Sequence, residues 1–186
     1  MSTTLVLDLE TTGFSREWDY ILEVAGVLVD NETGEVLDKF HEYIKPPKRI
    51  PAKISELTGI TDQKVKHCRT EREVVCDFAE WVYIARPDII MGHNCKAFDL
   101  SFLRTKAERY GTIWYDKCAI VDTLQMARDL AKKGKILTIN QRQETLAEYF
   151  GIKYNAHSAI DDVMALIEIH KRLVEVGRPK VEDLGF

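Results

Sequence analysis

The stretch LVLDLETTGF, residues 5–14, decides the fold because it combines an apolar strand pattern with two acids. Its first half predicts a buried strand over residues 3–9. Side chains alternate between the two faces of a strand, so Asp8 and Glu10 share one face and repel each other there. A divalent cation between them would relieve that repulsion, since hard cations prefer oxygen ligands. Solvated acids at a frayed strand end are the alternative.

The composition of the chain is that of a soluble globular protein. Its 186 residues, 45% hydrophobic and 30% charged, predict one domain with a substantial core. No apolar run is long enough to span a membrane, and no secretory leader or membrane partner is expected. Four cysteines without a C-x-x-C pair favour a reducing, cytoplasmic location over a disulfide framework or a zinc site. The net charge of −4 does not by itself favour nucleic-acid binding.

The order of predicted elements indicates the fold class. Two further strands, 21–30 and 34–44, are expected to form a hairpin through the turn residues of DNETGE. Strands then alternate with helices, which predicts an α/β fold with a mixed β-sheet flanked by α-helices. The expected helices are 52–58, 71–85, 97–110, 123–131, 143–150 and about 158–176. Gly177 and Pro179 end the last helix, so residues 1–176 are predicted as the domain and 177–186 as a C-terminal tail.

A second acid occurs in GHNCKAFDLSFL, residues 92–103. Asp99 lies in the first turn of a helix that follows a strand. The helix dipole favours an acid at such a position without any function. His93 and Asn94 can equally be residues that form the local turn. Taken alone, this segment is weak evidence for a site.

The third segment is NAHSAIDDVMALIEIHKRL, residues 155–173. On a helical wheel Asp162 falls inside the apolar arc, whereas Asp161 points toward solvent. His157 precedes Asp162 by five residues. A histidine at a helix start usually has only a turn or capping role, but the inward acid beside it favours a functional one.

Together the segments predict a cluster of four acids, Asp8, Glu10, Asp99 and Asp162. Such a cluster suits two divalent cations about 3.5–4 Å apart, the arrangement that hydrolyses phosphodiesters. Two dications would also offset the net charge of −4, which removes the objection that the charge raised against nucleic-acid binding.

These segments resemble the three motifs of the DEDDh exonucleases, a DnaQ-like group of the ribonuclease-H-like superfamily. The motifs are DLETTG (8–13), GHNCKAFDLSFL (92–103) and HSAIDD (157–162), and the resemblance covers about residues 4–173. A sister subclass would have Tyr where this chain has Ser158, so the His subclass fits. Three residues separate Asn94 from Phe98, the spacing of Trex-type relatives, whereas the bacterial proofreading form usually has two.

The resemblance implies a ribonuclease-H-like fold and 3′-to-5′ hydrolysis that releases nucleoside 5′-monophosphates. It implies two divalent cations, Mg²⁺ or Mn²⁺, held by Asp8, Glu10, Asp99 and Asp162. His157 would act as general base, a role that suits an imidazole with a pKa near neutrality. VDTLQMAR (121–128) also resembles a family stretch in which Asp122 would be structural.

The resemblance further implies contacts with a single-stranded 3′ end of DNA or RNA. The backbone of Thr11 would meet the terminal hydroxyl. Phe14 would stack on the last base, with ordinary packing inside the protein as the alternative. The remaining expected contacts are Leu57 and Thr58 near the penultimate base, with Asn94 and Phe98 along the strand's path. A polymerase or another replication or repair protein is an expected partner. Proofreading and RNA 3′-end trimming both remain open, as does a non-catalytic nucleic-acid-binding module, which would lack an acid or the histidine.

Overall fold

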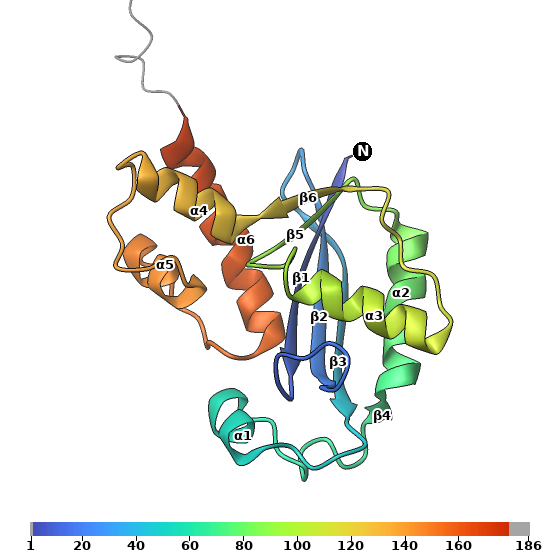
Figure 1. Cartoon of the computed structure of the whole chain (residues 1–186). Helices are drawn as coiled ribbons and strands as arrows, with labels where there is room; N and C mark the ends of the chain where they lie inside the picture. Colours follow the sequence, from blue (N-terminus) through green and yellow to red (C-terminus); the bar gives the residue numbers. More distant parts are fainter. Residues whose placement is uncertain (1, 179–186) are drawn as a thin grey trace, which may run out of the picture.

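The centre of the protein is a six-stranded mixed sheet, seen in a computed structural model that describes residues 2–178. The strands lie in the order β4-β3-β2-β1-β5-β6 (Figure 1). They are β1 (Thr3–Thr11), β2 (Ile21–Asp30), β3 (Val36–Lys45), β4 (Arg69–Thr70), β5 (Ile89–Gly92) and β6 (Ala119–Asp122). Strands β1, β2 and β3 pair antiparallel, whereas β5 is parallel to β1 and β6 to β5. The predicted α/β fold with a mixed sheet and the predicted hairpin are confirmed; the two-residue β4 was not predicted.

Helices cover both faces of this sheet (Figure 1). One face packs against α2 (Glu71–Ala85) and α3 (Asp99–Tyr110), and the other against α6 (Ala159–Gly177). The remaining helices are α4 (Thr123–Lys132) and α5 (Gln143–Phe150), which contact α6, and the short α1 (Ala52–Thr58). In Figure 1, α1 lies near the end of the sheet where β1 finishes. Among the described residues no helix is both long and apolar enough to cross a membrane.

The two faces of β1 explain why its acids lie where they do. Leu5, Leu7 and Leu9 belong to the core beneath α2 and α3. Val6 belongs to a separate core with residues of α6. Asp8 and Glu10 continue the Val6 face, because side chains two apart share a face. The carboxyl end of β1 therefore turns its acids toward the start of α6.

The strand β1 is longer than predicted, and this corrects the frayed-end interpretation. It runs to Thr11, and Glu10 pairs in register with Glu23 of β2. The register shifts only after Glu10, between Glu10 and Thr11. Glu10 therefore lies within the sheet and is only partly exposed.

Glycines end three of the predicted helices as expected. Gly59, Gly111 and Gly151 follow α1, α3 and α5 in the left-handed conformation, which glycine adopts without steric cost. The last helix ends at Gly177, one residue beyond the predicted end. Most of the predicted tail, residues 179–186, lies outside the described residues.

Candidate active site

Three of the four predicted acids come together at the end of β1. Asp8, Glu10 and Asp162 can each offer a carboxylate oxygen within 4.8 Å of the others. Asp162 lies in the first turn of α6, which begins over the face of β1 that carries the other two. All three line a cleft of about 1070 Å³ together with His157. Asp161, the acid predicted to face solvent, is not among the described residues that line this cleft.

The fourth acid, Asp99, reaches the same place from another direction. Strand β5 is the parallel neighbour of β1, so the helix that follows it, α3, begins beside β1. Asp99 is the first residue of α3 and is only 2% exposed. Its Oδ1 accepts a hydrogen bond of 3.1 Å from the backbone N–H of Leu9. Asp99 is not part of the three-acid set but lines the same cleft.

Burial raises the pKa of every one of these acids, and the charge of at least one nearby acid adds to the rise. The pKa of Glu10 rises to about 8, chiefly through burial and then through the charge of Asp162. Burial also raises the pKa of Asp99 to about 7 and that of Asp162 to about 6. The pKa of Asp8 lies well above its ordinary range, through burial and then the charge of Asp99. Closely spaced acids with raised pKa values fit a divalent cation, because the cation can take the place of their protons and bind their oxygens.

His157 stands beside this set in a strained conformation. Its φ of 67° is left-handed, which is uncommon for a residue with a side chain. Its backbone N–H donates to Oδ2 of Asp162 at 2.9 Å. This bond spans the five-residue interval of the third motif and therefore gives that spacing a structural reason. The imidazole Nε2 lies 3.1 Å from Oε1 of Glu144 on α5.

Two further residues of α5 hold the site and were missed in the sequence. Gln143 donates its Nε2 to Oδ1 of Asp162 at 2.8 Å and to the carbonyl of that residue at 3.0 Å. Glu144 meets His157 as described. Both stand in the first turn of a predicted helix, and only the packing of α5 on α6 brings them to the acids. Three cations that were also not predicted line the cleft: Lys53, Arg128 and Arg142.

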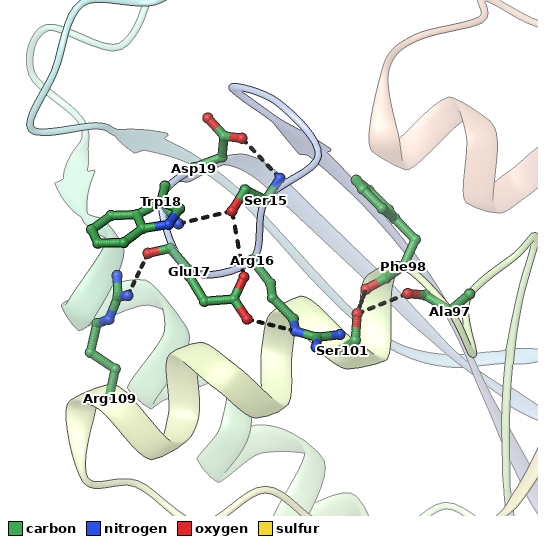
Figure 2. Close-up of polar contacts among 9 residues, drawn as sticks. All are labelled: Ser15, Arg16, Glu17, Trp18, Asp19, Ala97, Phe98, Ser101 and Arg109. Atoms are coloured by element: carbon green, nitrogen blue, oxygen red, sulfur yellow. Dashed lines mark hydrogen bonds and ion pairs between the residues drawn. The ribbon is translucent and has the colours of Figure 1, made fainter.

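The loop after β1 is tied down by polar contacts (Figure 2). The Asp19 carboxylate accepts a 2.9 Å hydrogen bond from the N–H of Ser15, which closes the loop on itself. Arg109 of α3 donates to the Glu17 carbonyl at 2.5 Å. Below the loop, the buried Lys106 donates to the Asp19 carbonyl at 2.5 Å. These contacts hold the loop against α3.

Four of the six predicted substrate contacts line the cleft: Phe14, Leu57, Asn94 and Phe98. Phe14 is 90% exposed, so it is not an ordinary core residue. Its ring centroid lies 6.2 Å from that of Phe98, in an edge-to-face arrangement.

The other two predicted contacts, Thr11 and Thr58, are buried. Neither is among the described residues that line the cleft. Thr11 donates its hydroxyl to the Gly13 carbonyl at 2.6 Å, and Thr58 donates to the Ile54 carbonyl at 2.9 Å. Thr58 instead lines a neighbouring cavity of about 370 Å³, which Leu57 and His157 also line.

Asp122 has the structural role expected of it. Its side chain caps α4 through the N–H of Leu124 at 3.1 Å. The same carboxylate accepts hydrogen bonds from the N–H groups of Asn94 at 3.0 Å and Lys96 at 3.3 Å. Asn94 itself has a φ of 63°, so it forms the turn between β5 and α3. Asp122 thereby fixes the bend that precedes Asp99.

The chain is similar to DNA polymerases and to an exonuclease of known structure. The chain is 37% identical over 186 residues to the DNA polymerase III PolC-type of Listeria welshimeri, matching 100% of this chain and 12% of that protein. It is 36% identical over 188 residues to the DNA polymerase III PolC-type of Bacillus subtilis, with 98% and 12% covered. The chain thus spans about 12% of the length of these curated relatives. The zinc-bound complex of E. coli exonuclease I with single-stranded DNA is 26% identical, with a TM-score of 0.80 over 99% of this chain and 42% of that one.

A family model supplies the assignment. Residues 5–170 match the model of the exonuclease family named after RNase T, a span that includes all four acids and His157. The chain therefore belongs to this exonuclease family, in the DnaQ-like group of the ribonuclease-H-like superfamily.

Proposed function

We propose that this chain is a metal-dependent 3′-to-5′ exonuclease that releases nucleoside 5′-monophosphates from single-stranded 3′ ends. The observation that carries the proposal is the three-acid set of Asp8, Glu10 and Asp162, whose oxygens lie within 4.8 Å beside His157. The raised pKa values support it, because acids so placed gain most from exchanging protons for a cation. The family to which the chain belongs supports the same reaction class.

The proposed mechanism gives each side chain one task. Two divalent cations, Mg²⁺ or Mn²⁺, would lower the pKa of a bound water and stabilise charge on the phosphoryl group and the leaving oxygen. Asp8, Glu10 and Asp162 would hold these ions as the closely spaced set, and Asp99 would contribute from the same cleft. His157 would accept the proton of the attacking water.

DNA is the substrate that we propose, in preference to RNA. The named relatives are DNA polymerases and an exonuclease bound to single-stranded DNA. Phe14, Leu57, Asn94 and Phe98 would contact the terminal nucleotides, because they line the cleft. Thr11 would contribute its backbone and Thr58 its place beside Leu57. RNA 3′-end trimming is the alternative that the substrate test must separate.

The proposal extends to partners and location. The PolC-type relatives are polymerases, which supports a polymerase or another replication or repair protein as a partner. A cytoplasmic location is proposed because the four cysteines, all within the described residues, are free thiols. A non-catalytic binding module on the same fold is disfavoured, because no acid and no histidine of the motifs is missing.

End-labelled single-stranded DNA, single-stranded RNA and a mismatched duplex would test the proposal. Each substrate is incubated with Mg²⁺, with Mn²⁺ and with EDTA, and products are resolved at single-nucleotide resolution. We expect stepwise release of 5′-monophosphates from the 3′ end in the presence of Mg²⁺ or Mn²⁺ and no release in EDTA. Activity that persists in EDTA would contradict a metal-dependent reaction.

A matched pair of variants tests the site itself. Asp162→Asn removes a carboxylate of the three-acid set and is expected to abolish hydrolysis. Asp161→Asn removes the same charge one residue earlier, outside the cleft, and is expected to keep most of it. The reverse order would refute the assignment of Asp162.

A further inference from the structure

Glu23 of β2 is a buried acid beside the three-acid set, and the mechanism above does not use it. In the antiparallel pairing of β1 and β2 it stands directly across from Glu10. Cross-strand partners project from the same face of a sheet. Glu23 therefore lies on the face that carries Asp8 and Glu10, and its exposure is 0%.

The two oxygens of Glu23 have different surroundings. Oε1 lies 2.7 Å from Nε2 of His41 on β3, an ion pair when the imidazole is protonated. Oε2 is buried and has no hydrogen-bond partner among the described residues. A buried carboxylate oxygen without a donor is costly, so almost all such atoms in native proteins are paired. The donor for Oε2 is thus to be sought outside the described residues 2–178.

A hydrated cation at the neighbouring acids would supply that donor. The charge of Glu23 adds to the repulsion that raises the pKa of Glu10 and of Asp8. Divalent cations bound by a few carboxylates keep several water ligands, whose O–H groups point away from the ion toward acceptors. A carboxylate with one oxygen fixed by His41 and the other free is suited to accept from such a water.

We propose that Glu23 accepts a hydrogen bond from a water ligand of the divalent cation held by Asp8 and Glu10. His41 fixes the Glu23 carboxylate for this contact through its 2.7 Å bond. The inference rests on the proposed metal-dependent function and adds a residue to its metal centre. Partners that orient ligands in this way typically contribute about 10–100-fold to metal affinity.

The test is Mn²⁺ binding to the full chain without nucleic acid, measured by isothermal titration calorimetry. Glu23→Gln keeps the size of the side chain and removes its charge, and should raise the Kd for Mn²⁺ about 10–100-fold. Glu42→Gln is the matched control, because Glu42 on β3 neighbours His41 and therefore points to the opposite face. A Kd for Glu23→Gln no higher than that of the control would overturn the proposal.

A second variant keeps the test valid should Glu23→Gln fold poorly, which thermal unfolding in EDTA would reveal. His41→Gln changes a partly exposed side chain and should also weaken Mn²⁺ binding relative to the wild type, and unchanged binding in this single variant would refute the positioning of Glu23 by His41. If His41 acts through Glu23, the double variant should bind no more weakly than Glu23→Gln alone. If the losses of Mn²⁺ binding free energy in the two single variants simply add in the double variant, the positioning role of His41 is refuted.

Failure of this inference can be told apart from failure of the proposed function. If the wild-type chain neither binds Mn²⁺ nor hydrolyses nucleic acid, the proposed function itself is wrong. If the wild type does both, and Asp8→Asn abolishes Mn²⁺ binding while Glu23→Gln binds normally, only the role of Glu23 is refuted.

Discussion

Replacing Glu10 by Gln is expected to stabilise the metal-free protein at neutral and higher pH. Burial and the charge of Asp162 raise the pKa of Glu10 from its ordinary 4.5 to about 8. Within that interval the native state holds a proton that the unfolded chain releases. The native state then binds more protons, so stability falls as pH rises from about 4.5 to about 8. Gln carries no titratable group, so the Glu10→Gln protein does not lose this stability as pH rises.

The size of the effect follows from the pKa difference. The interval of roughly 2.5 pH units up to pH 7, at about 1.4 kcal/mol per unit, sets an upper limit of about 3.5 kcal/mol on the gain in stability. Because the neighbouring acids share protons with Glu10, about 1–3 kcal/mol is expected. At roughly 2–4 °C per kcal/mol for a chain of this size, Tm should rise by about 2–12 °C at pH 7. Near pH 4.5 the rise should vanish.

Thermal unfolding followed by circular dichroism, in EDTA at several values between pH 4.5 and 8.5, measures this effect. Glu32→Gln, an exposed change in the turn after β2, controls for the loss of one surface charge. Saturating Mn²⁺ should reverse the order of stability, because Glu10→Gln removes a proposed ligand. A metal-free Glu10→Gln protein less stable than wild type at pH 7, or wild-type stability that does not fall with rising pH, would refute the reasoning.

Three further changes address the base, the loop and the core. His157→Ala should lower kcat about 10²–10⁴-fold while calorimetric Mn²⁺ affinity stays intact; a collapse of affinity would make His157 a ligand instead. Gly13→Ala places a Cβ 2.5 Å from Oδ2 of Asp19, the carboxylate that closes the loop after β1. The KM for oligonucleotides should therefore rise more than kcat falls. An unchanged KM would count against a role of this loop in substrate binding. Lys106→Met leaves the Glu71 carboxylate, 3.6 Å from the lysine Nζ, buried without its cation. Urea unfolding should then show a loss of about 3 kcal/mol, and a loss below about 1 kcal/mol would show that the pair is dispensable.

The sequence was sufficient wherever local chemistry controls the structure. Alternation along β1 placed Asp8 and Glu10 on one face, and the helical wheel separated Asp162 from Asp161. Turn residues predicted the hairpin, and glycines predicted helix ends, because their backbone preferences act within a few residues. The order of strands and helices then restricted the architecture to a mixed sheet with helices on its faces.

Features that depend on tertiary contacts were beyond the reach of these patterns. Glu23 became significant only through the register of β1 with β2, and Gln143 only through the docking of α5 on α6. Thr58 was predicted beside the penultimate base. Its hydroxyl donates to the Ile54 carbonyl within its own helix, a local bond that the sequence pattern did not predict, and its contact with substrate stays a prediction. Sequence patterns also did not predict the burial of Lys106. Lysine usually lies at the surface, but Lys106 is fully buried beneath the loop.

The lengths of the outermost strands have a consequence for how this chain can meet other proteins. The sheet ends in β4, with two residues, and in β6, with four. Long free edges invite another chain to add a strand through backbone hydrogen bonds, and short ones blunt that tendency. Strand addition is therefore blunted at β6. On the other side β4 pairs only with Ile44 and Lys45, so the edge of β3 from residue 36 to 43 has no strand partner among the described residues and is the edge open to strand addition.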